Sequence, residues 1–99
     1  MNSESDIFKR IKRDLNSSLA LTKRSIDLGF ADNMERNACL DKAKADLSKS
    51  EKFIKELEIQ YGMLSGRERD HYKTKLAKLR QQYENTRKRF FELEDEGLK

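Results

Sequence analysis

The sequence has no proline, no tryptophan and only four glycines among its 99 residues. Proline and glycine interrupt helices most strongly, so their scarcity favours long helices. The four glycines stand at positions 29, 62, 66 and 97 and divide the chain into three long segments. Runs of β-branched residues that alternate with polar residues are also lacking, which argues against a sheet.

Cysteine and long apolar runs are equally scarce. Cys39 is the single cysteine, so an internal disulfide is excluded and a reducing compartment is favoured. No apolar run approaches the ~20 residues that span a bilayer. The start of the chain shows no secretory signal, because no basic segment there precedes an apolar stretch. The net charge of +4 is mild, and it permits acidic partners without requiring them.

Side chains typical of catalysis or metal binding are few. His71 is the single histidine and stands far from Cys39 in the sequence. One histidine and one distant cysteine do not supply the usual ligand count of a zinc site. No glycine-rich loop precedes a helix as a phosphate-binding loop would. We therefore expect no enzyme activity, no cofactor and no metal site, with His71 on the surface and Cys39 buried or half-buried.

Apolar residues recur at alternating spacings of three and four in each of the three segments, which is typical of a helix with one apolar stripe. The spacing predicts helices at about residues 5–28, 34–62 and 66–94. Because the loops between them are short, neighbouring helices should be antiparallel. The predicted fold is all-α: a single domain over residues 1–99 that forms an up-down-up three-helix bundle with coiled-coil-like packing.

The helix ends also carry signals. Gly29 is expected to end the first helix, and Asp32 or Asn33 to cap the second. Ser65 and Glu68 have the spacing of a capping box at the start of the third. These residues place both turns between the predicted helices.

The predicted core follows from the stripes. Folding the second helix onto the third places Ile54 opposite Leu79, and Leu57 opposite Leu76. The same register brings Glu58 near Lys73 and Glu51 near Arg80. The expected core residues are Phe8, Ile11, Leu15, Leu40, Leu47, Ile54, Leu57, Tyr72, Leu76, Leu79, Tyr83 and Phe90.

Residues 67–89 are strongly basic, with nine Lys or Arg against three Asp or Glu. A nucleic-acid site would combine such charge with exposed aromatic residues, but Tyr72, Tyr83 and Phe90 fall on the predicted core stripe. A solvated helix face is the favoured interpretation, and we expect no nucleic-acid partner. A second basic cluster, Lys9–Arg13, resembles a short localisation or lipid-contact peptide, and solvated surface is again favoured.

Two apolar residues lie off the stripes, on the outward sides of their helices. Ile59 belongs to the second predicted helix and Phe91 to the third. An exposed apolar side chain is common on a protein surface, so local packing is an alternative interpretation for each. Ile59 and Phe91 are the predicted partner-binding residues.

Two stretches carry a family resemblance. They are "IKELEIQY" at residues 54–61 and, after a short turn, "RDHYKTKLAKLRQQYENTRKRF" at residues 69–90. Together they resemble the N-terminal domain of the Vti-type vesicle-transport v-SNARE family, which belongs to the Qb-SNAREs. The family's pattern of an arginine, a tyrosine three residues on and a heptad of apolar positions is matched by Arg69, Tyr72, Leu76, Leu79, Tyr83 and Phe90.

The resemblance implies a non-catalytic, monomeric Habc-like domain, in which a SNARE motif and a membrane anchor follow in a longer protein. It also implies protein partners: trafficking adaptors with ENTH-type domains, and cognate SNAREs bound through the SNARE motif. Membrane contact would be made only through the C-terminal anchor. The implied location is the cytoplasmic face of Golgi, trans-Golgi and endosomal membranes. Two alternatives remain open from the residues alone, a generic structural coiled-coil protein and a basic helical nucleic-acid-binding bundle.

Overall fold

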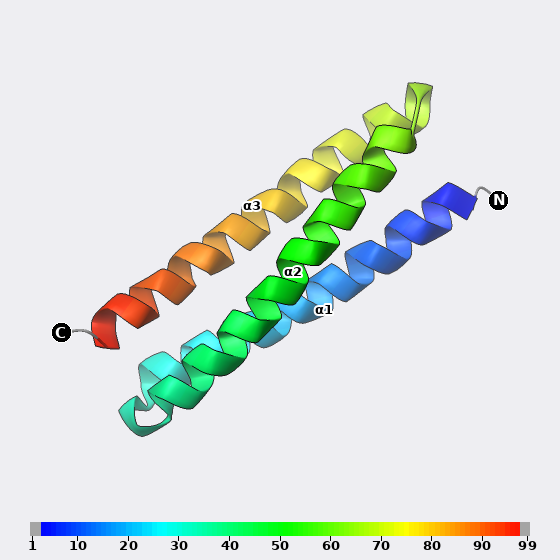
Figure 1. The fold of residues 1–99 in the computed structure, drawn as a ribbon. Helices are drawn as coiled ribbons and strands as arrows, with labels where there is room; N and C mark the ends of the chain where they lie inside the picture. The colour runs from blue at the N-terminus through cyan, green and yellow to red at the C-terminus, as the bar shows by residue number, and fades with distance from the viewer. Residues whose placement is uncertain (1–2, 98–99) are drawn as a thin grey trace.

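The computed structural model describes residues 3–97, which form three long helices packed side by side. Helix α1 spans Ser3–Ala31, α2 spans Arg36–Met63 and α3 spans Gly66–Gly97. A short 3-10 helix, η1 (Asn33–Glu35), joins α1 to α2. The chain runs up, down and up along a rod of 50 × 18 × 16 Å (Figure 1). The prediction of an all-α three-helix bundle is confirmed.

The first turn differs from the expectation at Gly29. Helix α1 does not end there but continues to Ala31, and the Asp32 amide still donates to the Leu28 carbonyl at 2.9 Å. Asp32 caps the short helix η1 rather than α2 itself: its side chain accepts a hydrogen bond from the Met34 amide at 2.9 Å, and α2 begins at Arg36 after Glu35, which makes no side-chain capping bond. The chain therefore turns three residues later than a glycine stop predicts.

Gly29 has another role, which explains why the helix passes through it. A Cβ atom at position 29 would lie 2.6 Å from Leu93 Cδ2 and 3.3 Å from Cys39 Cβ. Those distances are too short for an ordinary contact, so only a glycine leaves room for α3 to approach α1 this closely. Gly66, by contrast, has a φ of +58°, a left-handed conformation that suits glycine at the start of α3.

The core consists of two apolar clusters, one toward each end of the rod. The larger contains Phe8, Leu15, Leu57 and Leu76, and the smaller contains Ile26, Ala43, Leu47, Phe90 and Leu93. Ten of the expected core residues are buried: Phe8, Ile11, Leu15, Leu47, Ile54, Leu57, Tyr72, Leu76, Leu79 and Phe90.

Two expected core residues lie at its rim instead. Leu40 and Tyr83 are only half-buried, although both pack against the clusters. Leu40 stands in the second turn of α2, near the end of the rod, where fewer neighbours surround it. Tyr83 packs against both clusters from the side, which leaves part of the ring in contact with water.

The ion pairs of α2 differ from those predicted between α2 and α3. Glu58 pairs with Arg80, with Oε1 and Nε 3.6 Å apart, rather than with Lys73. Glu51 pairs with Lys55 one turn further along its own helix. Long charged side chains reach along the helix axis as well as across it. The alignment of the apolar stripes of α2 and α3 therefore did not determine which charged residues pair.

Candidate interaction surfaces

The first candidate surface lies at the end of α2 and contains Ile59. Because Leu57 is fully buried, Ile59, two residues further on, faces the opposite side of the helix and is 60% exposed. Met63 lies one turn beyond Ile59 and is 66% exposed, so the two side chains share one face. Gly62 lies between them, with nothing within 4 Å of the place where a Cβ would stand. We call Ile59, Gly62 and Met63 the Ile59 surface.

Met63 was not singled out in the sequence analysis. Met63 follows Ile59 by four residues, and this spacing predicts that the two side chains lie on the same face of a helix. Together they form a small, open apolar surface beside the turn into α3, of a kind that partner proteins bury.

Phe91, the other predicted binding residue, is 43% exposed near the end of α3. The Arg87 guanidinium carbon lies 5.2 Å from the centre of its ring, and the buried Phe90 ring meets it edge-on at 5.6 Å. These contacts hold the ring against its own helix. At about 1.5 Å per helical residue, Phe91 lies roughly 30 Å along the rod from Ile59. The two residues therefore belong to separate surfaces.

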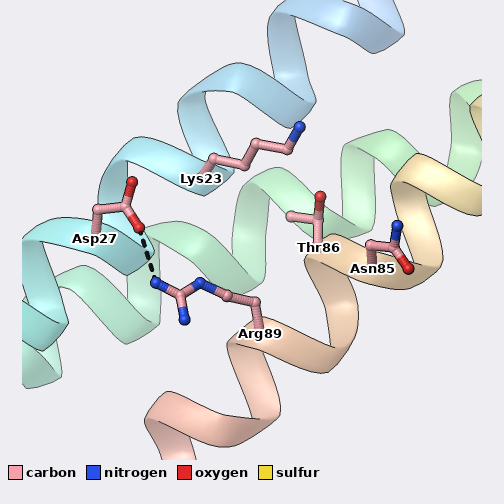
Figure 2. A pocket seen from close by; sticks show the side chains of 5 residues that line it. All are labelled: Lys23, Asp27, Asn85, Thr86 and Arg89. Carbon is pink, nitrogen blue, oxygen red and sulfur yellow. Dashed lines mark hydrogen bonds and ion pairs between the residues drawn. The ribbon is translucent and has the colours of Figure 1, made fainter.

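A groove between α1 and α3 forms a cavity of about 250 Å³ (Figure 2). It is lined by Lys23 and Asp27 of α1 and by Asn85, Thr86 and Arg89 of α3. Arg89 Nη2 lies 3.3 Å from Asp27 Oδ1, and Arg89 Nη1 lies 3.8 Å from Glu92 Oε2. The same guanidinium covers the Phe30 ring at 4.8 Å. Arg89 thus links the two helices.

Three of the nine cations in the basic stretch of α3, Arg80, Arg87 and Arg89, form ion pairs with this chain's own acidic groups. Arg80 pairs with Glu58, and Arg87 pairs with Glu84, each across 3.6 Å. Of the aromatic residues that a nucleic acid would need for stacking, Tyr72 and Phe90 are buried and Tyr83 is half-buried. Both observations favour the interpretation of a solvated helix face.

The titratable residues singled out from the sequence are placed as expected. His71 is exposed and meets Tyr72 edge-on, with ring centres 5.0 Å apart, and Cys39 is half-buried. Burial raises the pKa of the Tyr83 hydroxyl, and the nearby negative charge of Glu51 adds to the rise. Within residues 3–97, the described side chains include no group of three or more His, Cys, Asp or Glu able to hold a metal ion.

None of the helices described here has the length and apolar character needed to cross a membrane. A family model for the N-terminus of vesicle transport v-SNARE proteins matches residues 4–94. The match runs from the first turn of α1 to the last turns of α3 and so covers the whole bundle. Comparison with curated proteins and with solved structures finds no match for this chain.

Proposed function

Because the chain belongs to the family of vesicle transport v-SNARE N-terminal domains, we propose that its bundle is a non-catalytic adaptor-binding domain. Members of this family serve vesicle trafficking, and their partners are proteins such as other SNAREs. In this proposal the domain binds a trafficking adaptor with an ENTH-type domain and regulates the assembly of its cognate SNAREs. It acts on the cytoplasmic face of Golgi, trans-Golgi and endosomal membranes, and it catalyses no reaction.

The family match over residues 4–94 is the observation that carries this proposal. The surface of the bundle supports it. Ile59 and Met63 are both more than half exposed and stand on one face of α2. Exposed apolar side chains of this kind are typical anchors in protein interfaces. The Ile59 surface is the proposed adaptor site, and Phe91 is a second candidate at the other end of the rod.

The test is a titration of the isotopically labelled chain with an ENTH domain of an epsin-related adaptor, followed by amide NMR shifts at physiological salt. We expect the shifts to centre on the last two turns of α2. The variant Ile59→Asp should weaken binding at least ten-fold, because it places a charge in an apolar contact. Met34→Asp is the matched control, since Met34 is 95% exposed and lies far from this surface.

Three outcomes would separate the parts of the proposal. Shifts around Phe91 would move the site to the end of α3 and reject the Ile59 surface. Equal losses in Ile59→Asp and Met34→Asp would show that neither side chain is specific. No shifts at high adaptor concentration, with the spectrum of a folded helical domain, would remove ENTH-type adaptors as partners.

A further inference from the structure

The outward side of α1 carries cations that the bundle does not neutralise. They form two clusters, Lys9–Arg13 with four Lys or Arg, and Lys23 with Arg24. Among the residues that the structure describes, none of these six cations takes part in an ion pair. On α3, three of the nine cations in residues 67–89 pair with carboxylates: Arg80, Arg87 and Arg89.

Two exposed leucines lie along one edge of this outward side, next to Arg10 and Arg24. Leu21 is 46% exposed and Leu28 is 54% exposed, and the seven residues between them equal two helical turns. Leu28 and Arg24 line one shallow hollow, and Lys9, Lys12 and Arg13 line another further toward the start of the helix. We call the six cations with Leu21 and Leu28 the α1 face.

The shape of this face suits an extended anionic surface rather than a single bound anion. Lys9 and Lys23 are 14 residues apart, which is about 20 Å along a helix. The bundle is a rod 50 Å long, so it can lie with α1 flat against a plane. Cations spread along a helix with apolar side chains beside them are typical of helices that rest in a membrane interface.

We propose that the α1 face docks the bundle lengthwise on an anionic lipid bilayer, with its cations among the headgroups and Leu21 and Leu28 in the interface. Asp6 and Asp27 are exposed acidic residues on this side of α1. The charge of Asp27 is offset by Arg89 at 3.3 Å, and the six cations outnumber both carboxylates. A nucleic acid is disfavoured because Phe8 is buried and Phe30 lies half-buried beneath Arg89, which leaves these rings poorly placed to stack on bases.

This contact is separate from adaptor binding and from any anchor. It uses α1, whereas the proposed adaptor site lies on the outward side of α2. The bundle itself would thus contribute to membrane contact, beyond what an anchor alone provides. The two proposals can fail independently, because one is tested with lipid and the other with protein.

The test is flotation of the 99-residue chain with phosphatidylcholine vesicles, with and without phosphatidylserine at about one third of the lipid. We expect binding only to the vesicles that contain phosphatidylserine, and we expect added salt to weaken it. Each cation near an anionic bilayer strengthens binding about five-fold. The triple variant Lys9→Gln, Arg13→Gln and Arg24→Gln should therefore lose roughly 100-fold in affinity.

The matched control removes three exposed cations from the other helices: Lys49→Gln, Lys52→Gln and Lys88→Gln. It lowers the net charge by the same amount, so it should lose far less if the α1 face makes the contact. Equal losses in the two triple variants would overturn the proposal. So would binding to neither vesicle, with circular dichroism showing the helices intact.

A second measurement uses the absence of tryptophan from the sequence. Leu28→Trp places the single tryptophan of the variant on the α1 face, and the tryptophan emission should shift to the blue on phosphatidylserine vesicles. Ile59→Trp, exposed on α2, should not shift. The reverse pattern would overturn the proposal. Binding of an acidic peptide such as polyglutamate in place of vesicles would also overturn it, and would assign the face to an acidic protein.

Discussion

Gly29 shows how a single residue determines the approach of two helices. Inside a helix, glycine is about 1 kcal/mol less favourable than alanine. In α1 this cost is offset, because the missing side chain lets Leu93 pack to complete burial. The glycine is therefore a contact site for α3 rather than a stop signal for α1.

The Gly29→Ala variant should be less stable than the parent chain. The added methyl would meet Leu93 Cδ2 at 2.6 Å, and overpacking of this kind costs about 1–3 kcal/mol. Subtracting the helix-propensity gain leaves a net destabilisation of up to about 2 kcal/mol. Urea unfolding followed by circular dichroism measures this free energy.

The control is the same substitution in a Leu93→Val background, which lacks the Cδ atoms. There, Gly29→Ala should destabilise the bundle less than in the parent chain, because the contact with Leu93 Cδ2 is removed while the contact with Cys39 Cβ at 3.3 Å remains. The same effect of Gly29→Ala in both backgrounds would contradict the proposed contact.

At the scale of the elements, α1 and α2 are joined by a buried polar layer between the two apolar clusters. The Ser18 hydroxyl donates to the Asp46 carbonyl at 2.9 Å, and Ser50 Oγ lies 2.9 Å from both Ser18 Oγ and that carbonyl. The Ser50 hydroxyl has a single proton, so it donates to only one of these two acceptors at a time. Thr22 donates to the Ser18 carbonyl at 2.8 Å within α1. Small hydroxyl side chains thus let the two helices approach closely.

The buried polar layer predicts that substitutions at Ser18 and Ser50 have coupled effects on the free energy of unfolding. Each Ser→Ala change should cost about 1 kcal/mol for the lost hydrogen bond. The double variant should cost less than the sum of the two, because both single changes remove the same Ser18–Ser50 contact. Ser48→Ala, an exposed position on α2, corrects for the helix propensity of alanine. Additive costs would show that the two hydroxyls act independently.

At the scale of the whole molecule, the exposed apolar side chains are dispersed over the rod. They are Leu21, Leu28, Met34, Ile59, Met63 and Phe91, from α1, η1, α2 and α3. No extended apolar stripe of the coiled-coil kind is seen on the outside of the described residues, because the stripes of the three helices face one another. A bundle of this kind has little reason to associate with itself.

We therefore predict that the chain is a monomer. Sedimentation equilibrium should give a mass near 11.7 kDa at every concentration tested. A generic coiled-coil protein would instead associate through its stripes as the concentration rises. A mass that grows with concentration, and that falls back in the Ile59→Asp variant, would assign the Ile59 surface to self-association.

How well the sequence predicts the structure varies from residue to residue. The helices and most of the core were predictable, because spacings of three and four place Leu15, Leu57 and Leu76 on inward faces wherever the helices lie. Exposure of Ile59 was predictable for the same reason. The pairing of Glu58 with Arg80 was not, because long flexible side chains select partners from the local geometry.

Three amphipathic helices and their approximate ends follow from local patterns of residues, since periodicity and capping act within a few neighbouring residues. The role of Gly29 depends on how the helices pack, because the contact that requires it comes from Leu93, far along the chain. The packing of the helices also decides which cations remain unpaired. Arg89 pairs with Asp27 across the groove, while Lys9 and Arg13 stay exposed and form no ion pair with another described residue. Such pairing depends on distances between helices that no local pattern contains.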